Sequence, residues 1–479
     1  MKMYIGDEAR DSRDGKVIRV LNSATLEEID TVPAATPEDI DEAITLAYEN
    51  KAAWAATTVL ERGRILTRAA DLILEHEDEL ALSLSTEMGK IFREAKGEVH
   101  CASEILRGYV EQAKHFYGET MTTDAQTGTQ DDIIFTIHEP LGIVACIGPF
   151  NYPVELCMHK IASALCTGNC VVLKPATDNP LTVLKIVALM REAGVPGYAL
   201  QAVTGSGSVI GDLLTGDPRI NAVSFTGSTE VGKRIAANAS AQLKHLFLEL
   251  GGNDPFIVFE DADLDRAVEA AASGRLQNAG QTCCSPKRFL VQNSVREAFT
   301  QKLLARVQQV EILDPTDEAA SFGSMISPKA AANVDEQVKK TIEQGAVLLT
   351  GGKVLKTSYY APTILTGVTE QMDICTGMEV FGPVFPIIGF DTEEDAVRIA
   401  NNTPFGLNAG VMTKDYEKAF RVAKKLECGS VAINASGNYR NVDQPHGGRK
   451  DTGLGREGIC CTLREMTETK AFILKGVLR

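Results

Sequence analysis

Apolar and polar residues change their spacing along the chain. Residues 16–33 alternate in hydrophobicity between short turns, which predicts a small β-hairpin. From Pro37 the apolar residues recur every three or four positions, which predicts helices at 38–56, 61–76, 77–88 and 91–117. After the polar stretch 118–131, the pattern of residues 132–138 becomes that of a strand. We therefore expect a helical N-terminal region that gives way to strands.

From residue 141 short apolar runs alternate with helical segments. The predicted strands are 141–147, 170–174, 199–203, 221–225 and 245–250. The predicted helices are 153–166, 180–193, 208–215 and 229–239. Strands separated by helices of this length form βαβ units, so we expect a parallel sheet with helices on both faces. Ligands of such sheets bind at the carboxyl ends of the strands.

A second α/β alternation runs from Pro255 to about residue 450. It contains a strand at 256–259 and helices at 264–276, 295–311, 328–344, 392–401 and 416–426. The C-terminal apolar run, 471–477, predicts an exposed strand, and such strands usually pair with another strand. It could pair with 132–138 or with a second subunit. The predicted fold class is α/β throughout.

Composition narrows the functional classes. A chain of 479 residues is expected to form two or three domains, and 44% hydrophobic residues with 23% charged ones are typical of a soluble protein. The net charge of -16 argues against nucleic acid and acidic membranes as partners. No secretory signal or apolar run of ~18 residues is present. The odd count of 11 cysteines, without paired CxxC motifs, predicts a reducing, cytoplasmic location and no zinc site.

The segment Asn278–Arg288 has the features of a nucleophile loop. Cys283 lies in a small polar loop in which Gly280 leaves room for backbone amides, and Lys287 and Arg288 bring positive charge nearby. A catalytic cysteine needs such surroundings, because the thiolate is the nucleophile. The alternative is that Cys283 and its neighbour Cys284 are ordinary buried thiols.

Three loops after predicted strands indicate a dinucleotide. Gly205-Ser-Gly207-Ser-Val-Ile-Gly211 is a glycine-rich turn with one residue more than the usual fingerprint. Phe225-Thr-Gly227-Ser228 places free amides and a hydroxyl at a helix start, which suits a pyrophosphate. Lys174-Pro-Ala-Thr177 ends another strand with a lysine that can bond ribose hydroxyls. Plain turns would not account for three such loops on one sheet.

With these loops, Cys283 and Glu249, the sequence resembles the aldehyde dehydrogenase superfamily over essentially its whole length. The motifs are Pro149-Phe-Asn151, Lys174-Pro-Ala, Phe225-Thr-Gly-Ser-Thr, Glu249-Leu-Gly-Gly, Gly280-Gln-Thr-Cys283, Glu379-Val-Phe-Gly-Pro and Gly453-Leu-Gly-Arg-Glu-Gly. The resemblance implies a Rossmann-like cofactor domain (1–118 and 142–249) and an α/β catalytic domain (250–450). It also implies a β-strand arm (119–141 and 451–479) that completes a partner's sheet in a homodimer or homotetramer.

The resemblance also implies roles for single residues. Cys283 would attack the aldehyde carbon, the Asn151 side chain and the Cys283 amide would hold the oxyanion, and Glu249 would activate the hydrolytic water. The cofactor, NADP or NAD, would contact Ile147, Pro149, Lys174, Thr177, Gly207, Gly211, Phe225, Gly227, Ser228, Leu250, Glu379 and Phe381. Relatives that prefer NAD often have glutamate where Thr177 stands, so NADP should be accepted here.

Polar residues near the expected tunnel suggest the kind of aldehyde. His159 stands where the family often has a large aromatic, and Arg107, Arg288 and Arg440 could face the pocket. Arginines there would favour an aldehyde carrying a carboxylate, phosphate, phosphonate or sulfonate. The alternative is that each arginine is a partner in a surface ion pair. Through His159 and the segment Ser436–Arg440, the sequence most resembles one branch of the aldehyde dehydrogenase superfamily. That branch contains lactaldehyde, phosphonoacetaldehyde and non-phosphorylating glyceraldehyde-3-phosphate dehydrogenases, and succinate semialdehyde dehydrogenases are its close neighbours. His446, in place of a common aromatic, is a departure that prevents direct transfer of a substrate.

Other functions fit the sequence less well. A CoA-acylating relative commonly lacks the base that Glu249 supplies. A catalytically idle member of the fold would not be expected to keep Cys283, Glu249 and Asn151 together. A cysteine hydrolase would need a histidine partner for the thiol and would leave the cofactor loops unexplained.

Overall fold

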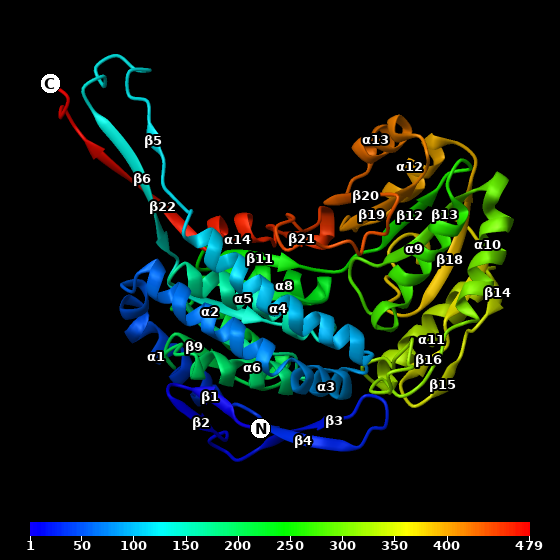
Figure 1. Ribbon diagram of the computed structural model, residues 1–479, viewed down its shortest axis with the longest axis horizontal. Coiled ribbons are helices and arrows are strands. Elements are labelled where there is room, and N and C mark those ends of the chain that lie inside the picture. The colour runs from blue at the N-terminus through cyan, green and yellow to red at the C-terminus, as the bar shows by residue number, and fades with distance from the viewer.

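The computed structural model describes all residues from 1 to 479. Two α/β units lie next to each other, and a narrow strand arm projects from the first (Figure 1). Each unit has its own hydrophobic core, of 67 buried residues in the first and 45 in the second. No helix is long and apolar enough to cross a membrane.

The first sheet has eight strands, of which five are parallel neighbours. In spatial order they are β2 (Glu8–Arg10), β1 (Met3–Ile5), β9 (Leu200–Ala202), β8 (Cys170–Lys174), β7 (Ile143–Ile147), β10 (Ala222–Thr226), β11 (His245–Glu249) and β21 (Gly453–Leu454). The chain builds β7, β8 and β9 toward one edge and then β10 and β11 toward the other. The order therefore reverses between β7 and β10, and such a switch point is where doubly wound sheets bind ligands.

Helices of the first unit follow the predicted pattern. They are α1 (Pro37–Ala55), α2 (Val59–Glu75), α3 (Glu77–Met88), α4 (Phe92–Ala113), α5 (Pro153–Cys166), α6 (Leu181–Glu192), α7 (Gly207–Gly216) and α8 (Thr229–Ser240). The bounds of α3, α5 and β8 match the predicted ones. Helix α4 ends at Ala113, four residues before the predicted end, and the short strands β1 and β2 were not predicted.

The second unit is built on a seven-stranded sheet. Its strands in order are β14 (Val347–Thr350), β17 (Thr363–Val368), β18 (Val384–Phe390), β13 (Pro286–Gln292), β12 (Asp254–Val258), β19 (Asn408–Met412) and β20 (Ser430–Ile433). Its helices are α9 (Leu264–Leu276), α10 (Asn293–Val307), α11 (Pro328–Glu343), α12 (Glu393–Asn401) and α13 (Tyr416–Lys425). Two hairpins lie outside the main sheets: β3 (Val17–Leu21) with β4 (Glu28–Pro33), and β15 (Val354–Lys356) with β16 (Tyr359–Tyr360).

The arm is a three-stranded antiparallel sheet that extends beyond the first unit (Figure 1). Strand β22 (Thr467–Leu474) pairs along its full length with β6 (Ile133–Pro140), and β5 (Thr120–Met121) pairs with the other edge of β6. The C-terminal strand thus begins four residues earlier than predicted and does pair with the 132–138 segment.

The predicted arm segment 451–479 starts too early. Strand β21 pairs with β11 of the first sheet, and helix α14 (Ile459–Glu465) buries Ile459 and Leu463 in the first core. Only the residues from Thr467 onward leave the body of the molecule. The apolar residues of α14 are buried in the core of the first unit. Strand β22, by contrast, has no second layer of the same chain against which its side chains could pack.

Candidate functional site

The cysteine loop approaches the first unit through three consecutive left-handed residues. A short 3-10 turn, Gln277–Gly280, follows α9, and Asn278, Ala279 and Gly280 have φ of 50°, 53° and 77°. A Cβ on Gly280 would lie 2.3 Å from the carbonyl carbon of Gly382, so only glycine fits there. This conformation is costly for Asn278 and Ala279, and such strain is found where a loop must present a side chain.

Cys283 and Cys284 are both partly exposed at the end of this loop. The neighbouring Cys284 thiol and burial raise the pKa of Cys283. The Lys287 ammonium lies beneath the loop, donates to the carbonyl of Thr282 at 3.0 Å and pairs with Glu379 at 3.3 Å. Its charge favours a thiolate at Cys283, as the sequence predicted for a lysine in this place.

A cavity of about 110 Å³ opens in front of the two thiols. Its walls come from both units and include Tyr152, Glu155, Cys283, Asn438, Arg440 and His446. Burial raises the pKa of Glu155, so this carboxyl holds its proton more firmly than an exposed one. The cavity is of the size of a small organic molecule, and six of its ten lining residues are polar.

Hydrogen bonds fix both the backbone and the side chain of Asn151. Its backbone carbonyl accepts hydrogen bonds from Lys90 Nζ at 3.1 Å and from Asn278 Nδ2 at 2.9 Å. Its own Nδ2 donates to the carbonyl of Gln281 at 3.1 Å, two residues before Cys283. An amide nitrogen carries two hydrogens, so one of them remains for a further acceptor.

Glu249 ends strand β11 and is almost completely buried. Burial, the Glu457 carboxylate and the Cys283 sulfur raise its pKa well above the ordinary carboxyl value. Its Oε2 lies 3.7 Å from Nε2 of His446, whose pKa is held well below its usual value by burial and by the Arg440 cation. Glu249 therefore faces a neutral imidazole and keeps a proton to higher pH than a surface glutamate.

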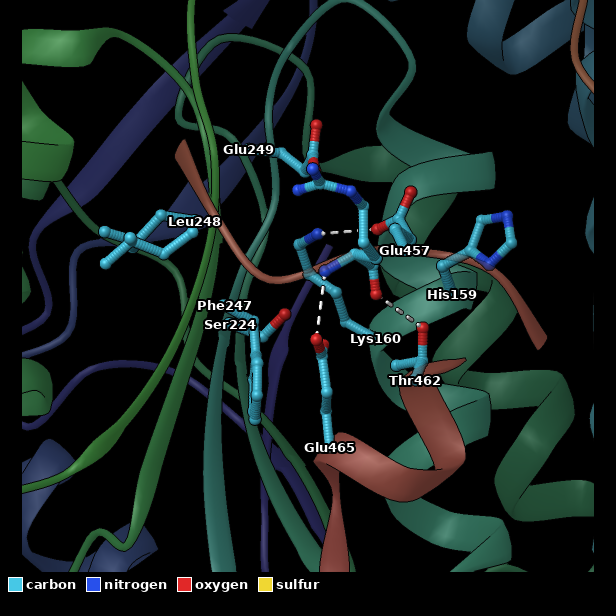
Figure 2. Close-up of a pocket in the computed structure, with 11 residues that line it drawn as sticks. His159, Lys160, Ser224, Phe247, Leu248, Glu249, Glu457, Thr462 and Glu465 are labelled. Carbon is cyan, nitrogen blue, oxygen red and sulfur yellow. Dashed lines mark hydrogen bonds and ion pairs between the residues drawn. The ribbon is translucent and has the colours of Figure 1, made fainter. Parts of the chain in front are cut away.

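Behind Glu249 lies a second, smaller cavity of about 20 Å³, which is large enough for one water molecule. Figure 2 shows Glu249, Lys160 and Glu457 around it. Lys160 Nζ donates to Thr226 Oγ1 at 2.7 Å and pairs with Glu457 at 3.1 Å. Although burial opposes it, the neighbouring cations Lys160 and Arg440 hold the pKa of Glu457 far below its ordinary value.

Arg440 connects this buried charge to the open cavity. Its Nη2 donates to Glu457 at 2.8 Å and lies 3.3 Å from His159 Nε2, and its Nε is 4.0 Å from Glu155. Against the effect of burial, the carboxylates of Glu457 and Glu155 raise the pKa of Arg440 further. Arg440 is therefore the one cation in the wall of the open cavity, whereas Lys160 pairs with Glu457 in the smaller cavity behind it.

His159 lies behind Arg440 and not in the wall of the open cavity. It is fully buried, and its Nδ1 is 3.2 Å from the Tyr109 hydroxyl. Burial lowers its pKa to about 3, so the imidazole is neutral. It supports Arg440 and does not line the path of a substrate, which corrects the expectation from the sequence.

Two of the predicted substrate arginines are elsewhere. Arg288 is fully buried on β13 and donates to the carbonyls of Asn253, Cys375, Ile399 and Ala400. Its guanidinium satisfies backbone acceptors inside the second unit, which explains how a charge can be buried there. Arg107 lies on the outer face of α4, is half-exposed and pairs with Asp71. Both were wrong as pocket residues because sequence distance from the nucleophile does not give side-chain direction.

The predicted phosphate loop lies at the start of α8. Ser228 caps this helix by accepting the Val231 amide at 3.4 Å, and Gly227 folds over the ring of Phe225, which a Cβ would approach to 2.3 Å. Gly207 and Gly211 lie on α7 and have open space where a Cβ would stand. A side chain at position 227 would therefore clash with the Phe225 ring, whereas side chains at positions 207 and 211 would meet no neighbour.

The loop after β8 carries Lys174, whose ammonium has hydrogens that are free to bind a ligand. Lys174 is nearly buried, and burial lowers its pKa to about 8. Its Nζ donates to the carbonyl of Pro175 at 3.1 Å, which uses one of three hydrogens. Thr177 Oγ1 donates to the carbonyl of Gly205 at 3.1 Å and so joins this loop to the glycine-rich turn. Ile147 and Pro149 are buried at the end of β7, beside this loop.

A third group of predicted cofactor residues lies between the two units. Glu379 accepts the Gly252 amide at 3.1 Å, and a Cβ on Gly251 would lie 2.4 Å from the same carboxylate. The ring of Phe381 lies edge-to-face with Phe150, with 5.9 Å between centroids. Leu250 packs closely on α8, where a Cβ on Gly232 would lie 2.4 Å from its side chain. The Glu379 carboxylate therefore lies against the backbone of Gly251 and Gly252, just after β11. Lys174 and the start of α8 lie at the same edge of the first sheet. This arrangement fits a dinucleotide.

Several site residues were not found from the sequence. Lys160 lies in a helix whose residues are almost all buried, and Glu457 lies in a motif that was recognised without a role. Lys90 and Glu98 form a buried ion pair beside Asn151. A charged residue within an apolar helical run is the signal that could have revealed Lys160, because such charges are buried only when paired.

Comparison with known proteins identifies the relatives. The sequence profile described as aldehyde dehydrogenase family matches residues 10–472. A glutarate-semialdehyde dehydrogenase of Pseudomonas putida is 39% identical over 98% of this chain and 96% of its own, and a 3-sulfolactaldehyde dehydrogenase of Priestia aryabhattai is 38% identical over 95% and 94%. The crystal structure of an Escherichia coli NADP dependent enzyme has a TM-score of 0.96 and 37% identity and covers 99% of this chain and 98% of that one.

Proposed function

Because the chain belongs to the aldehyde dehydrogenase family, we propose that it oxidises a small aldehyde with an anionic group at its far end to the carboxylic acid, with NADP or NAD as the hydride acceptor. The observation that carries this proposal is the placement of Arg440 in the wall of the cavity that contains Cys283. Relatives named for glutarate semialdehyde and 3-sulfolactaldehyde, both aldehydes with an anionic end, support the substrate class.

The first step uses the cysteine loop and Asn151. Cys283 reacts as the thiolate, which the Lys287 charge favours; its sulfur bonds to the aldehyde carbon, and the carbonyl oxygen gains the electron pair of the broken π bond. The free hydrogen of Asn151 Nδ2 and the Cys283 amide donate to that oxygen. Loss of one such donor typically reduces the rate about 100- to 1000-fold. The nicotinamide cofactor would accept the hydride from the C–H bond of the same carbon, the electron pair on oxygen would re-form the C=O bond, and the carbon would be left as a thioester on Cys283.

The second step uses Glu249. As a carboxylate it takes a proton from water, the water oxygen bonds to the thioester carbon, and the Cys283 sulfur leaves as the thiolate. The raised pKa of Glu249 makes it a stronger base than an ordinary carboxylate once it has ionised. A base whose pKa is close to the working pH is the best compromise between strength and ionisation.

The cofactor preference rests on the β8 loop. Lys174 has unused hydrogens, and Thr177 carries no charge that would repel a 2′-phosphate. These residues favour acceptance of NADP and leave NAD possible, and the E. coli relative is named for NADP.

The arm supports a homo-oligomer, as a dimer or tetramer. Strand β22 is an edge strand, and it exposes 66% of Ile473 and 44% of Leu474. A long apolar edge is a site for pairing with another chain. A second copy of this protein is the occupant that the family resemblance implies.

Glu249 should give hydrolysis of the acyl-enzyme a characteristic pH dependence. The carboxyl form cannot accept a proton, so the hydrolysis rate should rise with pH as Glu249 ionises, over a range above that of an ordinary carboxyl group. The acyl-enzyme can be formed with p-nitrophenyl acetate without cofactor and its decay followed from about pH 5 to 9. Glu249→Gln should retain the acylation burst and slow decay about 100-fold or more. A decay rate that ignores pH would contradict the assignment.

Arg440→Met should remove the preference for an anionic aldehyde. We expect kcat/KM for 5-oxopentanoate to fall about 10- to 100-fold, because a hydrogen bond to a charged group contributes about 1.5–3 kcal/mol. The uncharged aldehyde pentanal, of equal chain length, should be affected about twofold or less. Arg107→Gln, which changes an arginine outside the cavity, is the matched control and should alter neither rate. Equal losses on both aldehydes would assign Arg440 to support of Glu457 alone.

Thr177→Glu should turn the enzyme toward NAD. A carboxylate there would repel the 2′-phosphate of NADP, and we expect kcat/KM for NADP to fall about 100-fold while the value for NAD changes little. Thr177→Val is the control, since it removes the hydroxyl without adding charge. Absorbance at 340 nm with either cofactor measures both values. Unchanged NADP use in the glutamate variant would place the 2′-phosphate elsewhere.

Ile473→Lys should disrupt assembly while leaving the arm folded. The backbone of β22 stays paired with β6, and stacking of Phe472 on Phe135 is untouched. A charge on the exposed strand face should block its burial against a partner, so the particle mass should fall on size-exclusion chromatography with light scattering. Lys470→Ala, on the same strand, is the control for a mutation of the arm as such. A monomeric wild-type protein, or no change in mass, would refute the proposal.

A further inference from the structure

We propose that Glu98 and Lys90 are positioning residues that set the location of Asn151 relative to Cys283. The proposal rests on the proposed function, because it assumes that Asn151 holds the oxyanion. Neither residue touches the open cavity, and both belong to the region where α4 begins. Their effect is transmitted through the first turn of α5.

Glu98 replaces the missing cap of α5. Tyr152, at the cap position, makes no side-chain hydrogen bond to the helix, and Pro153 has no amide hydrogen. The free amides of Val154 and Glu155 donate to Glu98 Oε1 at 2.8 and 3.2 Å. A buried carboxylate from another helix thus fixes the start of α5, two residues after Asn151.

Lys90 ties the other oxygen of Glu98 to Asn151 itself. Its ammonium is fully buried, forms an ion pair with Glu98 Oε2 and donates to the carbonyl of Asn151 at 3.1 Å. It also lies 3.6 Å from the centroid of the Tyr152 ring. The charge is satisfied from three directions, so it has one position rather than a range of them.

The same helix also holds the cysteine loop. Glu94, one helical turn before Glu98, accepts the Asn278 amide at 3.0 Å. The side chain of Asn278 in turn donates to the carbonyl of Asn151 at 2.9 Å. Helix α4 therefore fixes Asn151 through Glu98 and the nucleophile loop through Glu94, although these two parts belong to different units.

This arrangement determines which way the free hydrogen of Asn151 points. One hydrogen of Nδ2 is used by Gln281, and the other is left for the oxyanion. An error of about 1 Å in the position of a catalytic group can reduce the rate about 100-fold. A loosened α5 start should therefore lower kcat more than it changes substrate binding.

A buried carboxylate that caps a helix could instead contribute only to stability, and Glu87 provides the comparison. It is fully buried and accepts the amides of Leu181 and Thr182, each at 2.8 Å, at the start of α6. Helix α6 carries none of the proposed catalytic residues. Glu87→Gln thus makes the same chemical change at the same kind of cap, away from the cysteine.

The test is a double-mutant cycle in the full-length enzyme, with 5-oxopentanoate and NADP. We expect Glu98→Gln to lower kcat about 10- to 100-fold with KM changed less than about threefold, and Glu87→Gln to leave kcat near the wild-type value. In an Asn151→Ala background, Glu98→Gln should cost about twofold or less, because its effect passes through Asn151. The far-UV circular dichroism spectrum of each variant checks that it is folded.

Each outcome has a distinct meaning. If the Glu98 and Asn151 losses multiply, Glu98 does not act through Asn151 and the inference is wrong. If Asn151→Ala alone has no effect, the oxyanion role in the proposed function fails instead. If Glu98→Gln does not fold, Lys90→Met replaces it in the cycle, since it removes the other member of the ion pair that positions Asn151. A Lys90→Met loss that persists in full without Asn151 would equally overturn the inference.

Discussion

A single backbone carbonyl, that of Asn151, joins the two halves of the site. It accepts one hydrogen bond from Lys90 of the first unit and one from Asn278 of the second. The left-handed turn that carries Asn278 is strained, and the strain is tolerated because this bond and the Glu94 carboxylate determine its conformation. Each unit by itself would present a loop without a fixed partner. The distance between the oxyanion donor and the sulfur is therefore a property of the contact between the units.

Buried charged residues surround this contact and shift the pKa values of its two glutamates. Glu457 is paired with both Lys160 and Arg440 and remains ionised in spite of its burial. Glu249 has no comparable partner, and its pKa rises for that reason. Two glutamates in neighbouring positions thus have pKa values displaced in opposite directions. Such separation is the usual arrangement when one carboxylate is a fixed charge and the other exchanges protons.

Most of the fold could be predicted from the sequence, because it depends on local patterns. Fully buried strands such as β8 are continuous apolar runs, and Pro153 marks the start of α5 in the expected way. The family resemblance, which is confirmed by the match over residues 10–472, further located the cysteine loop. The assignment of residues 451–466 to the arm failed because apolar α14 has two possible partners, a core and another subunit, and periodicity does not distinguish them.

The side chains of the pocket were less predictable, since their direction depends on tertiary contacts. Arg288 and Arg440 both looked like cations near the nucleophile, yet one binds backbone carbonyls inside the second sheet and the other reaches the cavity. Arg440 is also one of the groups that favour the ionised form of Glu249. An anion bound beside Arg440 would offset part of that effect, so the charge of the substrate and the strength of the base are physically linked. A motif can identify the nucleophile and the base, but this linkage exists only in the assembled site.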